Sequence, residues 1–159
     1  MAHLDCGHIA NHWVWHALSC LPDKIRAELD EKLAFVCMAE SDARRLTPQF
    51  VGGRHVIVLS ERIVPLEQSD EGSPEVRYLY FGVLHEVAHA FRQHRLPSEI
   101  SQEENEHQEA EADELAFEWF NGSLQAKANP MLPPFTRKEL AKAKATAMTR
   151  AVPPRPQAI

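Results

Sequence analysis

Residues 73–92 read SPEVRYLYFGVLHEVAHAFR and carry the strongest helical pattern of the chain. Ser73 suits the N-cap of a helix and Pro74 its first position, and we expect the helix to end before Pro97. Apolar side chains recur every three or four residues, as on one helix face: Val76, Leu79, Tyr80, Val83, Leu84, Val87 and Phe91. The pattern predicts a helix that packs this face on the core.

Inside this predicted helix, His85, Glu86 and His89 form the pattern H-E-x-x-H. Residues four apart share a helix face, so the two imidazoles can bind one zinc ion from the same side. Glu86 stands next to the first histidine, where its carboxylate can take a proton from a zinc-bound water. The pattern arises by chance about 0.05 times in a chain of this composition. The alternative interpretation is that the two histidines cap or pack a helix.

A second helix, expected over residues 101–122, offers the third protein ligand that a catalytic zinc needs. Ser101 and Glu104 suit a capping box at its start, and Asn121-Gly122 suits its end. Small residues allow this helix to approach the first closely, and aromatic residues continue its buried side: Ala110, Ala112, Ala116, Phe117 and Phe120. The two helices together predict a metal site between them.

Glu109 is the expected third ligand. It shares a helix face with Asp113, whose carboxylate can accept a hydrogen bond from the distal N–H of His85 or His89 and so fix the ring. Glu111 is the rival ligand, but it lies about 200° around the helix from Glu109. The two glutamates therefore cannot both face the metal.

Three further residues are candidates for the cleft. His94 follows His89 by five residues, about 140° around a continuous helix. It can be a ligand only if the helix breaks soon after His89, and otherwise it can line the cleft. Tyr80 and His107 are candidates for stabilising the oxyanion.

The H-E-x-x-H pattern, followed by Glu109, Ala112, Asp113, Leu115 and Ala116, resembles the ImmA/IrrE-type zinc metallopeptidases, which are gluzincin-like. The resemblance covers roughly residues 50–122. It implies a compact, mostly helical α+β domain of the zincin type, in which the active-site helix packs on a small sheet. It also implies cytoplasmic cleavage of a protein substrate, typically a transcriptional repressor. The chain departs from the family at 119–122, where Trp-Phe-Asn-Gly replaces the usual Leu-Leu-x-Pro.

Patterns elsewhere predict the remaining elements. We expect a short helix over 8–20 and a second helix that begins at Asp23 and carries on one face Ile25, Leu29, Leu33, Val36 and Cys37. A loop over 41–54, a strand over 55–59 and a surface loop over 67–74 should follow. After the site helices we expect a linker over 129–134 and a basic helix, which begins with a capping box formed by Thr136 and Glu139. The strand can bind an extended substrate along its edge, or it can be an ordinary core strand.

Length and composition bound the class of protein. A chain of 159 residues predicts one domain: a zinc-metallopeptidase-like domain over 1–135, a basic helix over 136–150 and a disordered tail over 151–159. Up to residue 123 there are 10 Lys and Arg against 22 Asp and Glu. We therefore do not expect the main domain to bind nucleic acid, because phosphate contacts need a basic face.

Two further features concern location. No apolar run approaches the roughly 20 residues of a membrane span, and no secretory signal is evident, so we expect no membrane partner. Three cysteines without a C-x-x-C pair favour a reducing, cytoplasmic setting.

A separate group of candidate ligands lies near the N-terminus. His8, His12, His16 and Cys20 recur every four residues, so neighbouring pairs on a helix can chelate a second, structural zinc. The alternative is a polar-aromatic helix that binds no metal.

These patterns lead to three hypotheses. The first is a zinc metallopeptidase that hydrolyses peptide bonds of a protein substrate, with Glu86 as general base. The second is a non-catalytic zinc-binding interaction module, in which a fourth protein ligand fills the open metal position. The third is a zinc hydrolase with another kind of substrate, which the motif cannot separate from the first. Glu86 favours an enzyme, because a structural zinc site needs no such carboxylate.

Overall fold

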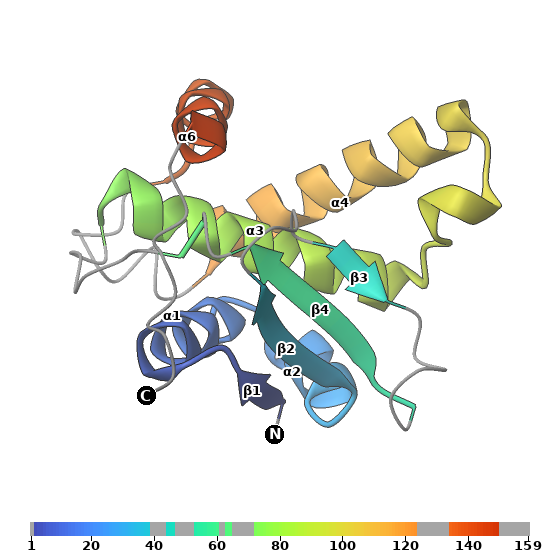
Figure 1. Cartoon of the computed structure of the whole chain (residues 1–159), viewed down its shortest axis with the longest axis horizontal. Coiled ribbons are helices and arrows are strands. Elements are labelled where there is room, and N and C mark those ends of the chain that lie inside the picture. Colours follow the sequence, from blue (N-terminus) through green and yellow to red (C-terminus); the bar gives the residue numbers. More distant parts are fainter. Residues whose placement is uncertain are drawn as a thin grey trace, which may run out of the picture.

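The computed structural model describes residues 2–38, 44–46, 53–60, 63–64, 72–123 and 134–149. Helices pack around a small sheet (Figure 1). The strands are β1 (His3–Asp5), β2 (Leu33–Met38), β3 (Arg44–Leu46) and β4 (His55–Ser60), and the helices are α1 (His8–Leu18), α2 (Asp23–Leu29), α3 (Pro74–Arg92), α4 (Gln102–Gly122) and α6 (Arg137–Thr149), with a 3-10 turn over Pro97–Glu99. The predicted α+β class is confirmed. None of the described helices combines the length and apolar character needed to cross a membrane.

The sheet has the strand order β1-β2-β4-β3. β1 and β2 pair in parallel, as do β2 and β4, where Leu33 stands opposite His55, whereas β3 runs antiparallel to β4. Both sides of β4 are therefore paired, and the idea that strand 55–59 offers a free edge to a substrate is wrong. Its side chains Ile57 and Leu59 are fully buried, so it is the core strand of the alternative interpretation.

The segment after Asp23 corrects the expectation of one helix as far as Cys37. α2 ends at Leu29, and Leu33–Met38 forms β2, which pairs on both sides. A short, uninterrupted apolar run is typical of a strand buried on both faces, and its periodicity does not separate it from a buried helix. The expected loop over 41–54 is also interrupted, by β3.

α3 occupies the centre of the molecule and contacts α1, α4, α6, β3 and β4 (Figure 1). Its start is as predicted, because the Ser73 hydroxyl accepts a hydrogen bond from the Val76 N–H. Six residues of its predicted apolar face have no exposed surface: Val76, Leu79, Tyr80, Val83, Leu84 and Val87. The H-E-x-x-H motif therefore lies on a helix that its neighbours hold on several sides.

α4 and α6 begin as the sequence predicts. The Ser101 hydroxyl accepts from the Glu104 N–H at the start of α4. At the start of α6, Glu139 N–H donates to Thr136 and Thr136 N–H donates to Glu139, which is a capping box. The buried Arg77 of α3 binds Glu139 across 2.9 Å and fixes α6 to α3. The surface loop, the linker and the tail expected from the sequence lie almost wholly outside the described residues.

Ser73→Ala should lower the free energy of unfolding by about 1 kcal/mol, because it removes the side-chain cap of α3. Denaturant unfolding followed by circular dichroism measures the change. Ser98→Ala, at an exposed position of the 3-10 turn, is the control and should leave the value unchanged. An equal loss in both variants would contradict a capping role.

Candidate metal centre

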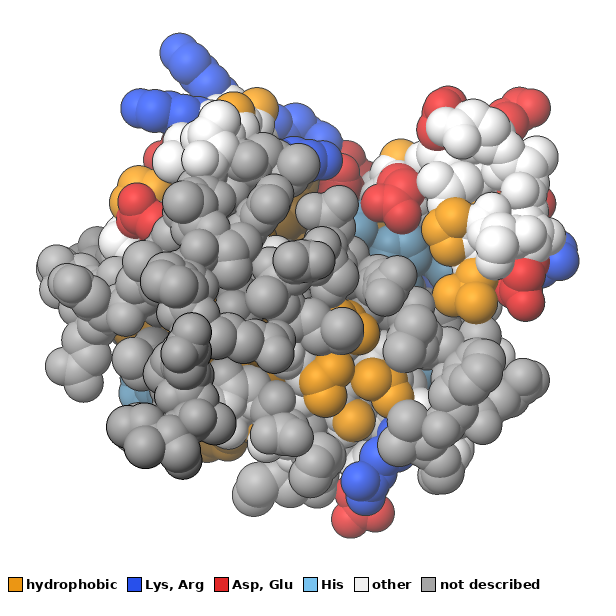
Figure 2. Space-filling view, in the orientation of Figure 1, with side chains coloured by type: hydrophobic (Ala, Val, Ile, Leu, Met, Phe, Trp, Pro, Cys, Tyr) orange, Lys and Arg blue, Asp and Glu red, His pale blue; other side chains and the backbone are white. Residues whose placement is uncertain are grey.

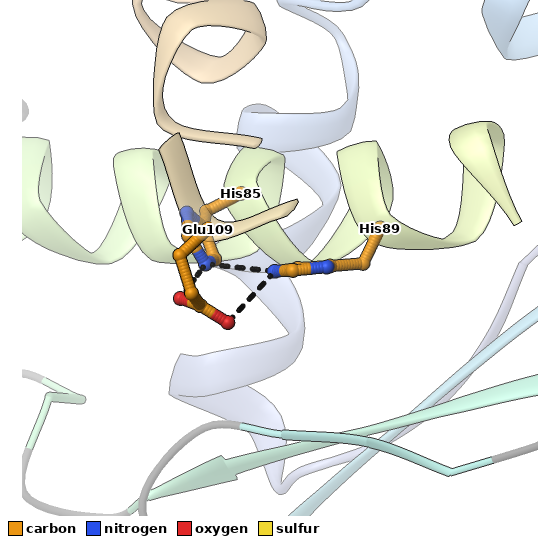
Figure 3. Close-up of side chains that lie close together, drawn as sticks. All are labelled: His85, His89 and Glu109. Atoms are coloured by element: carbon orange, nitrogen blue, oxygen red, sulfur yellow. Dashed lines mark hydrogen bonds and ion pairs between the residues drawn. The ribbon is translucent and has the colours of Figure 1, made fainter. Parts of the chain in front are cut away.

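Three side chains converge on a common point, and each offers one potential metal ligand (Figure 3). His85 and His89 come from α3, and Glu109 comes from α4. His85 Nε2 lies 3.1 Å from His89 Nε2 and 3.3 Å from Glu109 Oε2, and His89 Nε2 lies 3.4 Å from Glu109 Oε1. The imidazoles are 15% and 11% exposed, whereas the Glu109 side chain is 48% exposed. These three residues can hold a metal ion, and the carboxylate side of the group faces solvent.

The close packing of α3 and α4 explains why these side chains meet. Ala112 and Ala116 of α4 are fully buried, and their small side chains allow the two helices to approach each other. The rings of Phe81 on α3 and Phe117 on α4 also meet, tilted by 57° with centroids 4.9 Å apart. Ala110 is exposed, so the prediction that it also lies in this contact is wrong.

His85 is supported by Asp113, as the spacing of Asp113 and Glu109 predicts. Its Nδ1–H donates to Asp113 Oδ1 at 2.8 Å, which leaves Nε2 toward the other two ligands. Burial opposes protonation of His85, but hydrogen bonds to Asp113 and Glu109 and the charge of Glu86 outweigh it and raise its pKa to about 9. The hydrogen bond from His85 in turn lowers the pKa of Glu109. Protonated His85 can therefore donate to Asp113 through Nδ1 and to Glu109 through Nε2.

His89 is supported by a residue whose role the sequence left open. α3 ends at Arg92, and His94 then folds back, so that its Nδ1 lies 2.9 Å from His89 Nδ1 and its Nε2 lies 2.9 Å from Glu111 Oε2. The helix break that ligation by His94 requires is present, yet His94 meets the distal nitrogen of His89 and not the ligand group. Glu111, the rival ligand, binds His94 and Arg92 instead. The hydrogen bond from His94 holds the pKa of Glu111 below its usual value.

The remaining candidates lie in different surroundings. Glu86 is 6% exposed and stands beside His85 on α3. Tyr80 has no exposed surface and packs against the rings of Trp13 and Phe120, which contradicts the prediction that it lines an open cleft. His107 is exposed on α4, and its charge acts on Glu111. Its role in stabilising an oxyanion stays a prediction.

His12, His16 and Cys20 lie along α1 and the turn after it. The rings of His12 and His16 on α1 are tilted to each other with centroids 4.5 Å apart, and the buried Cys20 contacts the carbonyl of His16. The side chain of His8 lies outside the described residues. Among the side chains that the structure describes, a set of three potential ligands occurs only at His85, His89 and Glu109. A second zinc on α1 stays a prediction.

The surface is hollowed between α6 and the start of α4 (Figure 2). Figure 2 shows histidine side chains between α6 and the start of α4, with acidic side chains on the α4 side. The charge of Lys144 on α6 lowers the pKa of Glu109 after the effects of the two histidines, so α6 lies close enough to act on the site. The two walls of the hollow thus differ in charge.

The chemistry of the donor set fits zinc. Two imidazole nitrogens and one carboxylate oxygen are ligands that zinc accepts, and three protein ligands leave one tetrahedral position for water. Each imidazole also has a partner for its distal nitrogen, which is the usual surrounding of histidine ligands. Comparison with known proteins found no family model, no curated protein and no solved structure that matches the chain.

Proposed function

We propose that the chain is a zinc-dependent metallopeptidase. The observation that carries this proposal is the convergence of His85, His89 and Glu109 on one point that is partly open to solvent, with Glu86 adjacent on the same helix. Zinc bound there would supply a Lewis acid that acidifies water and polarises a carbonyl group. No other described side chain joins the three ligands, which favours an enzyme over a structural site with four protein ligands.

The residues of the chain have distinct roles in this proposal. His85, His89 and Glu109 hold the metal, and Asp113 orients His85. Glu86 takes a proton from the attacking water and later gives it to the leaving amine, so that the peptide bond is replaced by a carboxylate and an amine. Glu86 is 6% exposed, so its side chain lies mostly out of contact with bulk water.

The resemblance of the motif to the ImmA/IrrE-type peptidases supports a proposal for the class of substrate. It suggests an intracellular protein substrate, and a transcriptional repressor is the substrate class that we propose. The pairing of Asp113 with His85 and the choice of Glu109 over Glu111 fit the gluzincin arrangement on which this resemblance rests.

A substrate trap tests the proposed function. Zinc-loaded Glu86→Gln should retain substrate that the parent releases as products, and the double variant Glu86→Gln, Glu109→Ala, which lacks a metal ligand, is the control. Proteins retained by the first variant and not by the second are then incubated with the parent. The proposal requires that the zinc-loaded parent cuts at least one of them and that Glu86→Gln does not. Retained proteins that the parent leaves intact would count against a peptidase.

The raised pKa of His85 predicts a pH dependence of metal binding. Protonated His85 stabilises the metal-free fold, fully below about pH 6.5 and less as the pH rises through about 9. A metal must displace this proton, so the zinc affinity should rise about tenfold per pH unit between pH 7 and 9 and level off above. Chelator competition across this range measures it. A flat profile would contradict the raised pKa.

A further inference from the structure

The end of α3 brings His94 back against the metal ligand His89. Gln93 adopts a left-handed conformation with φ 55° and ψ 38°, which stops the helix. The His94 N–H then donates to the carbonyl of His89 at 3.0 Å. Because of this turn, the imidazole of His94 is buried beside that of His89, with rings 4.9 Å apart, although a continuous helix would place the two on different faces.

One face of α4 holds this turn in place. Gln108 accepts a hydrogen bond from the Arg95 N–H at 2.9 Å and donates to the Arg95 carbonyl at 3.1 Å. Glu111, three residues further along α4, binds His94 at 2.9 Å and Arg92 at 3.0 Å. Residues three apart lie on the same side of a helix. The turn after α3 is therefore clamped by two side chains of the helix that also supplies Glu109.

The chemistry of these contacts fixes the hydrogen positions. An ionised Glu111 only accepts, so His94 Nε2 carries a hydrogen and donates to it. In neutral His94 the other nitrogen, Nδ1, is then an acceptor, and the hydrogen bond between the two Nδ1 atoms requires that His89 carries its hydrogen on Nδ1. His89 Nε2 then carries no hydrogen, and its lone pair lies toward His85 and Glu109. In this series of hydrogen bonds, Glu111 sets the position of the hydrogen on His94, and His94 sets the position of the hydrogen on His89.

We propose that His94 and Glu111 are positioning residues that hold His89 in the tautomer and orientation needed for metal binding. This inference rests on the metal site of the proposed function. The two histidine ligands are supported differently. His85 donates directly to the carboxylate of Asp113, whereas His89 is linked to the carboxylate of Glu111 through the imidazole of His94. α4 thus supplies one ligand and the carboxylates that support both others.

Substitution of His94 tests the inference. His94→Leu fills a similar space but cannot hydrogen-bond, and it should weaken zinc binding by about 10–100-fold. His94→Gln keeps an acceptor toward His89 and a donor toward Glu111, and it should recover most of the affinity. Gln102→Ala, at an exposed position at the start of α4, leaves the turn and both contacts of His94 intact, so it is the control and should bind zinc as the parent does. Chelator competition gives the affinities, and the visible spectrum of the cobalt(II)-substituted chain reports the geometry of the ligands.

A measurement on the metal-free parent keeps the inference testable if a variant does not fold. Nitrogen-15 NMR of the histidine rings should find the hydrogen of His89 on Nδ1. A hydrogen on Nε2 would overturn the inference, as would His94→Leu with the zinc affinity and cobalt spectrum of the parent. The proposed function fails in a different way, if the parent binds no zinc at all or if zinc-loaded Glu86→Gln hydrolyses peptides as fast as the parent does.

Discussion

Glu86→Gln should slow peptide hydrolysis by about 10²–10⁴-fold, the usual contribution of a general base, while the chain keeps its zinc. The amide has nearly the shape of the carboxylate but cannot accept the proton of the attacking water. Glu86 is not one of the three convergent ligands, so the metal content should not change. Hydrolysis rates by mass spectrometry and zinc content by elemental analysis measure both effects.

The same substitution at Glu103 is the matched control, because this glutamate is exposed at the start of α4. Glu103→Gln should hydrolyse peptides at the rate of the parent. A Glu86→Gln chain as fast as the parent would rule out proton transfer by this residue. A Glu86→Gln chain that has lost its zinc would instead give Glu86 a role in holding the metal.

Glu109→Ala should weaken zinc binding by more than about 100-fold. Loss of a residue that only hydrogen-bonds to a metal ligand already lowers metal affinity by about 10–100-fold, and loss of a ligand should lower it further. The substitution removes the only carboxylate among the three convergent ligands. Hydrolysis should be lost with the metal at zinc concentrations that saturate the parent. Chelator competition measures the affinity, and circular dichroism checks that the variant folds.

Glu118→Ala is the control for Glu109→Ala, since it removes an exposed carboxylate from the same helix. It should bind zinc as the parent does. Unchanged zinc affinity in Glu109→Ala would mean that the third ligand lies elsewhere, and Glu111 would then be the first residue to substitute.

The sequence predicts the two helices of the site because their signals are local. Ser73 and Ser101 each cap a helix through a contact three residues ahead, and the buried face of α3 follows the period of a helix. The preference for Glu109 over Glu111 also came from helix geometry, because only Glu109 shares a face with Asp113. The structure agrees, with Asp113 on His85 and Glu111 turned to His94.

The sequence does not predict features that depend on distant partners. β2 is a strand because β1 and β4 pair with it on both sides, and its own residues suit either a buried helix or a strand. Tyr80 follows the apolar pattern of α3, and the packing of Trp13 and Phe120 around it decides that it is core.

The contact of His94 with His89 depends on the turn at Gln93, a residue type with no strong preference for a left-handed conformation. The one signal in the sequence was Pro97, which required the helix to end nearby. The angle of about 140° between His89 and His94 holds only for a continuous helix, and the turn at Gln93 interrupts this one.

The decisive measurement is hydrolysis of a defined peptide library in oxygen-18 water by the zinc-loaded chain. We predict new peptide ends that carry one oxygen-18 in the carboxyl group, formed only with zinc bound and lost in Glu109→Ala. A chain that holds one zinc per molecule at His85, His89 and Glu109 and leaves every peptide intact would contradict a metallopeptidase, as would cleavage that continues at full rate after the zinc is removed.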